Sequence, residues 1–208
     1  MNAIPSSLSW MFPNGYTPWA PIYDPGNAPP AVTTNITLDL QADLFIDEGE
    51  VFYASHTIDT FTVSWSFPDI VNRGVMWIEG SDNVVAISGY NMGLIENYGV
   101  VNAYSSQGTA RGVSISSWGV LHNYGDINAA SYSDEATGFV TFSTGKADNA
   151  EFHINTGNIT VWSGQYGVAG VRLENGGRFD NSGDIIATGY SYATAIGVRI
   201  HEAVINNT

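Results

Sequence analysis

An asparagine that precedes a glycine by two positions recurs along most of the chain at nearly constant spacing. These asparagines, together with one in an incomplete copy, are Asn72, Asn97, Asn123, Asn155, Asn181 and Asn207. The successive steps between them are 25, 26, 32, 26 and 26 residues. One period of about 26 residues with a single insertion is typical of a solenoid, in which coils stack and each coil contacts only its neighbours.

The residues around each motif fall into columns of constant polarity, as expected where alternate residues of a strand face opposite sides. Two positions before the asparagine stand Ile70, Ile95, Leu121, His153, Phe179 and Ile205. Four and six positions after it stand Met76, Val101, Ile127, Ile159 and Ile185, then Ile78, Ala103, Ala129, Val161 and Ala187. We expect these columns to face an interior. The intervening columns are mixed and should face outward: Val75, Val100, Asp126, Asn158 and Asp184, then Trp77, Asn102, Asn128, Thr160 and Ile186.

The Asn-x-Gly step has the composition of a corner between two strands, because glycine accepts positive φ and asparagine hydrogen-bonds nearby backbone. Stacked coils would place each asparagine over the next at the strand spacing of about 4.8 Å. We therefore predict a structural ladder of side-chain amides along the axis. Its members are Asn97, Asn123, Asn155, Asn181 and Asn207.

These patterns predict an all-β fold, a parallel β-helix (β-solenoid) of roughly 26-residue coils. A second repeated strand, such as Gly112-Val-Ser-Ile and Gly197-Val-Arg-Ile, supplies another wall. A sandwich of hairpins is the competing all-β fold, but independent hairpins have no reason to keep a constant step with matching columns. Helices are disfavoured because glycine is frequent and no long segment shows a 3.6-residue period.

We divide the chain into an extended N-terminal arm, residues 1–34, and a solenoid, residues 35–208. Within the solenoid, residues 35–69 are interpreted as irregular first coils or a cap, and residues 70–208 as regular repeats. The insertion is expected as a loop between Gly138 and Phe152. The last copy stops inside its motif at Asn207-Thr208, which indicates that the natural protein continues or that the chain is a fragment.

The arm holds seven of the eight prolines of the chain, which favours extended structure. Its large aromatic side chains make free solvation unfavourable, so we expect them to dock on this protein or on a neighbour. They are the predicted assembly residues Trp10, Phe12, Tyr16, Trp19 and Tyr23. Contact between one copy's arm and another copy's last coil would produce a head-to-tail filament, with a folded-back arm as the alternative.

The net charge of −14, with six Lys and Arg against twenty Asp and Glu, opposes binding to phosphate backbones and anionic lipids. Nucleic acid is therefore not an expected partner. The chain has no cysteine, so neither disulfides nor thiolate metal sites are available. No apolar run of about twenty residues is present, and membrane insertion is not expected.

Asp126 and Asp184 are the candidate catalytic residues, because both occupy one outward column two coils apart. Two carboxylates roughly 10 Å apart would flank a sugar, as in polysaccharide-cleaving β-helix enzymes. They would also suit Ca²⁺, which prefers oxygen ligands. The alternative is that each aspartate merely solvates a turn. We expect no enzymatic activity, no metal site and no cofactor, with Ca²⁺ as the one open alternative.

Other chemistry-bearing residues have structural alternatives. Arg172 and Arg199 share an outward column, where they would bind an acidic group or pair with local acids such as Glu174. His153 stands in an interior column, unless a one-residue slip lets Ile154 replace it. Tyr98 and Tyr124 are expected to stack as a turn ladder, while the outward Trp77 and Trp162 would suit stacking on sugars.

The repeat, as in Leu121-His-Asn-Tyr-Gly-Asp-Ile-Asn-Ala with its Ala-x-Gly-Val strand at Ala195, resembles the repeats of large bacterial surface and secreted β-solenoid proteins. These include autotransporter passengers and adhesin-like proteins exported by type I systems. The resemblance covers Ile70 to Thr208. The calcium nonapeptide Gly-Gly-x-Gly-x-Asp of type I-exported proteins is not matched, because Gly176-Gly177-Arg178-Phe179-Asp180 lacks the third glycine.

The resemblance implies an extracellular, cell-surface location and a non-enzymatic structural or adhesin-like role, with self-assembly into a filament or surface layer. The other function class is a carbohydrate-active β-helix enzyme or a glycan-binding module that acts on polysaccharide.

Overall fold

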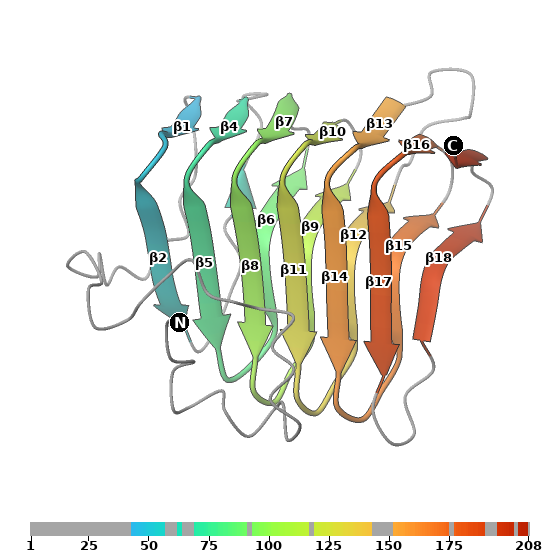
Figure 1. Cartoon of the computed structure of the whole chain (residues 1–208). Helices are drawn as coiled ribbons and strands as arrows, with labels where there is room; N and C mark the ends of the chain where they lie inside the picture. The colour runs from blue at the N-terminus through green and yellow to red at the C-terminus, as the bar shows by residue number, and fades with distance from the viewer. Residues whose placement is uncertain are drawn as a thin grey trace.

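The computed structural model describes residues 43–56, 62–63, 69–90, 93–116, 119–142, 152–174, 177–189, 195–201 and 204–207. Within these ranges all regular secondary structure is β-strand. The strands form three parallel sheets of seven, six and six strands. Figure 1 shows that the sheets are the walls of one stack of coils. The predicted all-β parallel β-helix is confirmed.

We name the three walls sheets A, B and C. Sheet A contains β1 (Leu44–Ile46), β4 (Ile70–Asn72), β7 (Leu94–Asn97), β10 (Val120–Asn123), β13 (Phe152–Asn155), β16 (Arg178–Asn181) and β19 (Val204–Asn207). Sheet B contains β2 (Val51–His56), β5 (Val75–Gly80), β8 (Val100–Ser105), β11 (Asp126–Ser131), β14 (Asn158–Ser163) and β17 (Asp184–Gly189). Sheet C contains β3 (Thr62–Val63), β6 (Val84–Tyr90), β9 (Ala110–Ser116), β12 (Ala136–Phe142), β15 (Val168–Glu174) and β18 (Ala195–His201).

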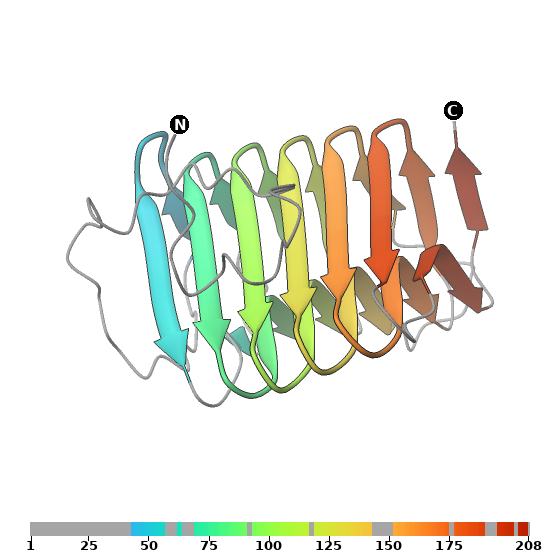
Figure 2. The same ribbon diagram turned by 60° about the horizontal axis from the view of Figure 1, so that its bottom comes forward.

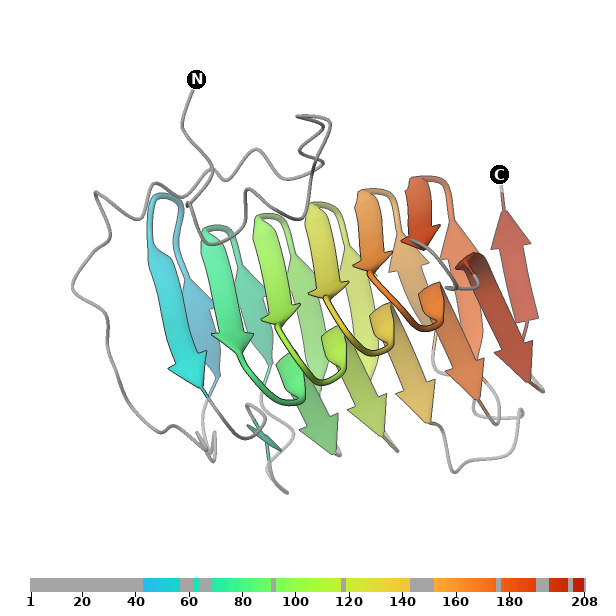
Figure 3. The same cartoon turned by 90° about the horizontal axis from the view of Figure 1, so that it is seen from below.

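Three consecutive strands make one coil, and each strand pairs with the strand three places further along the chain. Figures 2 and 3 show how the three walls enclose a single interior along the stack. The pairing keeps the sequence columns aligned: Asn97 pairs with Asn123, and Ile127 pairs with Ile159. The first three strands already follow this scheme, because β1, β2 and β3 pair with β4, β5 and β6.

The long repeat step places its extra residues at one corner. Three residues separate β9 from β10, which spans Val120–Asn123, whereas nine separate β12 from β13, which spans Phe152–Asn155. The difference of six equals the excess of the 32-residue step over 26. The insertion therefore lies between Phe142 and Phe152, within the expected Gly138–Phe152 interval, and residues 143–151 lie outside the described residues.

The interior columns are buried as predicted, except in the last coil, where Ile185 and Ala187 are only partly buried. Ile70, Ile95, Leu121, His153 and Phe179 are all fully buried, one above the other along sheet A. The same hydrophobic cluster includes residues of the other two walls, Ile127 and Ile159 of sheet B and Ile115 and Leu173 of sheet C. Burial of each large aliphatic side chain stabilises the fold by about 1.5–3 kcal/mol.

The glycine of the Asn-x-Gly corner has a different purpose from the predicted one. Among the described glycines, positive φ occurs only at Gly49 and Gly177. At Gly125 an added Cβ would collide with the carbonyl oxygen of Gly99, and at Gly157 with that of Gly125. Glycine is thus required because successive corners approach each other closely, and the expectation of positive φ was wrong.

Candidate functional site

The asparagines at the sheet A–sheet B corner are linked by side-chain hydrogen bonds. Each Nδ2 donates to the Oδ1 of the next coil. The Nδ2–Oδ1 distances are 2.8 Å for Asn72 to Asn97, 2.7 Å for Asn97 to Asn123, 2.6 Å for Asn123 to Asn155, 2.6 Å for Asn155 to Asn181 and 2.8 Å for Asn181 to Asn207. From Asn72 to Asn155 the side chains are fully buried. The amides of Asn97, Asn123 and Asn155 are therefore hydrogen-bonded on both sides away from water.

Backbone groups complete the corner. The N–H groups of Tyr98 and Gly99 both donate to the carbonyl of Asn72, at 2.8 and 3.0 Å. The second Nδ2 hydrogen of Asn123 donates to the carbonyl of Gly125 at 3.0 Å. At the start of the ladder, β1 presents Ile46 opposite Asn72, and the buried Oδ1 of Asn72 has no hydrogen-bond partner among the described residues. The ladder thus has a defined first member.

A second ladder, which the sequence analysis missed, runs along the sheet B–sheet C corner. Ser105, Ser131 and Ser163 end β8, β11 and β14 and are fully buried. Ser131 Oγ donates to the carbonyl of Gly108 in the previous coil at 2.7 Å and accepts from the N–H of Asp134 at 2.9 Å. The sequence pattern that could have revealed this ladder is a serine eight positions after the asparagine in three copies of the repeat, where two other copies have glycine.

The candidate catalytic column lies on the outer face of sheet B. Asp126 pairs with Asn158, which pairs with Asp184, so the two aspartates stand two coils apart. Asn158 Nδ2 donates to Asp126 Oδ1 at 2.8 Å, and Asp184 is exposed. Two strand spacings separate the aspartates, about 10 Å. The column is a row of oxygen and amide groups facing solvent, able to hydrogen-bond polar ligands such as hydroxyl groups.

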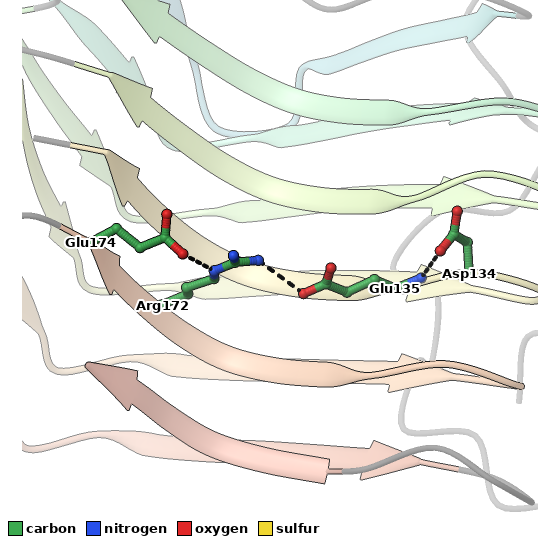
Figure 4. A network of polar contacts seen from close by, with 4 residues as sticks. All are labelled: Asp134, Glu135, Arg172 and Glu174. Atoms are coloured by element: carbon green, nitrogen blue, oxygen red, sulfur yellow. Dashed lines mark hydrogen bonds and ion pairs between the residues drawn. The ribbon is translucent and has the colours of Figure 1, made fainter. Parts of the chain in front are cut away.

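Arg172 is engaged by local acids, as one of the sequence alternatives proposed. Its Nε donates to Glu174 Oε1 at 2.5 Å and its Nη1 to Glu135 Oε1 at 3.2 Å. Figure 4 shows this chain of contacts continuing to Asp134, whose Oδ1 accepts the N–H of Glu135 at 2.7 Å. Arg199 is in strand register with Arg172, and its side chain lies outside the described residues. A guanidinium already flanked by two carboxylates is occupied rather than open to an acidic ligand.

His153 occupies the interior column, so the alternative in which Ile154 replaces it is wrong. His153 pairs with Phe179 in register and is fully buried. Its Nδ1 accepts the N–H of Leu121 at 3.1 Å, and its ring meets Phe139 edge-on at 4.9 Å between ring centroids. Burial, aided by the nearby His122, lowers the pKa of His153 to about 3. The imidazole is therefore neutral at ordinary pH and caps a backbone group inside the core.

The exposed aromatic pair forms the predicted turn stack. The rings of Tyr98 and Tyr124 lie 4.8 Å apart between centroids at an interplanar angle of 13°. The Tyr98 hydroxyl donates to Glu96 Oε1 at 3.0 Å, and this bond is the main reason why the pKa of Tyr98 is raised. The stack therefore joins two neighbouring coils through one face of each ring.

Trp77 and Trp162 point outward from sheet B, as expected, but are buried. They are therefore not open platforms for sugar stacking in this structure. The predicted assembly residues Trp10, Phe12, Tyr16, Trp19 and Tyr23 lie outside the described residues.

The described residues contain no group of three His, Asp or Glu side chains placed to hold a metal ion. In that same part of the chain, no helix is long and apolar enough to cross a membrane. No protein-family model, curated protein or solved structure matches this sequence significantly.

Proposed function

We propose that this chain is a non-enzymatic structural rod of an extracellular surface protein, with an adhesin-like role. The observation that carries the proposal is the asparagine ladder, which runs from Asn72 to Asn207 through every coil between them and is buried from Asn72 to Asn181. A buried amide without its partners costs about 1–3 kcal/mol, so the ladder favours one fixed stacking over looser alternatives. The result is a stiff spacer.

The dimensions fit that role. Sheet A has seven strands, and six spacings of about 4.8 Å give a wall of about 29 Å along the axis. Repeats of the same design extend such a rod without new chemistry, because each coil contacts only its neighbours. The resemblance to bacterial surface and secreted β-solenoid repeats supports a cell-surface location.

The experiment measures polysaccharide cleavage by the full chain. Release of reducing ends and of unsaturated uronates is followed on acidic and neutral glycans, with Asp126→Asn and Asp184→Asn as matched variants. We expect no turnover by any of the three proteins while their circular dichroism spectra stay alike. Turnover by the wild type that either variant abolishes would replace the structural rod by an enzyme.

A glycan-binding or carbohydrate-active module is the second candidate, favoured by the outward column of Asp126, Asn158 and Asp184. Binding of soluble oligosaccharides by calorimetry tests it directly. Heat that saturates for the wild type and disappears in Asp184→Asn would support this second candidate, whereas no heat with any glycan supports the rod alone.

Head-to-tail association into a filament or layer remains part of the proposal, with another copy of the chain as the partner. Light scattering over a range of concentrations tests it, with and without residues 1–34. Growth of particle mass that needs the arm would support the filament, and a constant monomeric mass for both forms would contradict it.

A further inference from the structure

The tyrosine stack at the sheet A–sheet B corner leaves one ring face exposed. Arg73, Tyr98 and Tyr124 directly follow ladder asparagines in three successive coils. The Arg73 guanidinium lies 5.9 Å from the centroid of the Tyr98 ring, and the other face of that ring stacks on Tyr124. The stack therefore follows the rod axis, and the second face of Tyr124 points to the next corner, which holds Thr156. A threonine is too short to cover a phenol ring, and 40% of Tyr124 is exposed.

A carboxylate leans over the same step between two coils. Asp126 stands two residues after Tyr124, and its Oδ1 accepts the Nδ2 of Asn158 in the next coil at 2.8 Å. Its side chain therefore points in the same axial direction as the exposed ring face, and none of the hydrogen bonds between described residues uses its Oδ2. Asp184, exposed one coil beyond Asn158, adds a second negative charge. The step thus combines an aromatic face with an available carboxylate oxygen.

The chain itself shows which group such a surface holds. Arg178 lies over the Phe152 ring at 4.6 Å from the centroid and donates from Nε and Nη2 to the Asp180 carboxylate, at 3.0 and 2.9 Å. A guanidinium stacks on aromatic faces and forms paired hydrogen bonds with carboxylates. Tyr124 and Asp126 offer the same two groups, and no described arginine lies on them.

We propose that the exposed face of Tyr124, with Asp126 beside it, binds an arginine side chain from a basic segment of another protein. The guanidinium lies flat on the ring and donates to the Asp126 carboxylate. Its methylene stem rests on Ile154, which is half-buried on β13 beside the Thr156 corner. Figure 1 shows that β10 and β13, which lead into the two corners, are neighbours. The net charge of −14 attracts a basic segment towards this site.

A second copy of this chain is a poor source of that arginine. The arginines whose side chains the structure describes are already engaged. Arg73 and Arg111 face aromatic rings, and Arg172 and Arg178 pair with acids. The inference rests on the adhesin-like role proposed above, for which it names the chemistry of the partner. A neutral glycan would use the ring face but gain nothing from the negative charges, so the charge of the ligand separates the two possibilities.

Amide chemical shifts of the full ¹⁵N-labelled chain, measured by NMR during a titration, test the proposal. The probe is a short peptide of glycine, serine and arginine, and its matched control carries citrulline, which has nearly the same shape without the charge. The variants Tyr124→Leu and Asp126→Asn each remove one group of the site. Tyr166→Leu is the control, since Tyr166 is 58% exposed at the other corner, between β14 and β15. Thr156→Tyr covers the exposed ring face with a third ring and removes neither group.

We expect the arginine peptide to shift the amides around Tyr124 and Thr156 in a saturable way at low salt, and the citrulline peptide to leave them unchanged. Tyr124→Leu and Asp126→Asn should each weaken binding about fivefold. Thr156→Tyr should abolish it, and Tyr166→Leu should leave it as in the wild type.

Equal shifts with both peptides, or no shift with either, would overturn the proposal. A loss of affinity in Tyr166→Leu as large as that in Tyr124→Leu would assign the binding to the acidic surface at large and overturn it too. Shifts of the same amides by neutral oligosaccharides alone would assign the ring face to glycans, with the same consequence. If Tyr124→Leu does not fold, Thr156→Tyr, which keeps both tyrosines, carries the test. Polysaccharide turnover is measured separately, so the structural rod and this site can fail independently.

Discussion

Replacing Asn123 by alanine removes the middle member of the asparagine ladder and should destabilise the protein strongly. Asn123 accepts from Asn97 at 2.7 Å and donates to Asn155 at 2.6 Å and to the Gly125 carbonyl at 3.0 Å. Three bonds at about 1 kcal/mol each, plus the buried Oδ1 of Asn155 left without its donor, give about 4 kcal/mol. For a chain of this length that lowers the melting temperature by about 10 °C.

Asn72→Ala is the matched control, because it removes the same atoms from the first position of the ladder. Asn72 donates to Asn97 at 2.8 Å and to the Val100 carbonyl at 3.2 Å, but its own buried Oδ1 has no hydrogen-bond partner among the described residues. Asn72→Ala also leaves the buried Oδ1 of Asn97 without its donor, but this cost is offset by the loss of the unpaired Asn72 Oδ1, so about 2 kcal/mol remains.

Both variants are compared with the wild type by urea unfolding and by thermal melting. The cavity left by the deleted side chain is alike in the two variants, so their difference reports the hydrogen bonds. Asn72→Ala that destabilises as much as Asn123→Ala, or two variants that melt like the wild type, would refute the ladder as a source of stability.

Three further predictions concern other positions. The pKa of His153 is about 3 in the folded chain and near 6.5 in the unfolded chain, so the free energy of unfolding should fall as the pH decreases from 6.5 towards 3, by about 2 kcal/mol at pH 5. Urea unfolding midpoints measured against pH should show this fall for the wild type and for the control His122→Asn, but not for His153→Phe. Gly125→Ala should cost about 3 kcal/mol by forcing a Cβ onto the Gly99 carbonyl. The control Gly167→Ala, whose Cβ meets nothing within 4 Å, should melt within a degree or two of the wild type. Ser131→Ala should cost about 1–2 kcal/mol in urea unfolding because the Asp134 N–H and the Gly108 carbonyl lose their partner; no change would mean that water replaces the hydroxyl.

The period and the columns were enough to predict the stacked sheets, because a strand's alternation and a constant step both translate directly into register. Asn97 and Asn123 were predicted as ladder members for that reason, and the structure places them in contact. The position of His153 in an interior column indicated that it is buried. Its hydrogen bond to the N–H of Leu121 could not be predicted, because it depends on how the chain re-enters the stack after the insertion.

Other features depend on neighbours that a linear sequence does not reveal. The Asn-x-Gly glycine was assigned to positive φ from residue type, whereas the close approach of the next corner decides it. Ser131 resembled an ordinary loop residue, since its role lies in bridging two coils. Alternation predicted the outward direction of Trp77 correctly but did not predict its burial.

Scalar couplings across hydrogen bonds, measured by NMR on the deuterated, ¹⁵N,¹³C-labelled chain, test the central claim most directly. In the ladder, the Nδ2 of Asn97 should correlate with the side-chain carbonyl carbon of Asn123, Asn123 with that of Asn155, and Asn155 with that of Asn181. The account predicts this continuous series, with side-chain amide protons that exchange slowly with solvent. Rapidly exchanging amides with no correlation between successive asparagines would contradict a rod held together by its ladder.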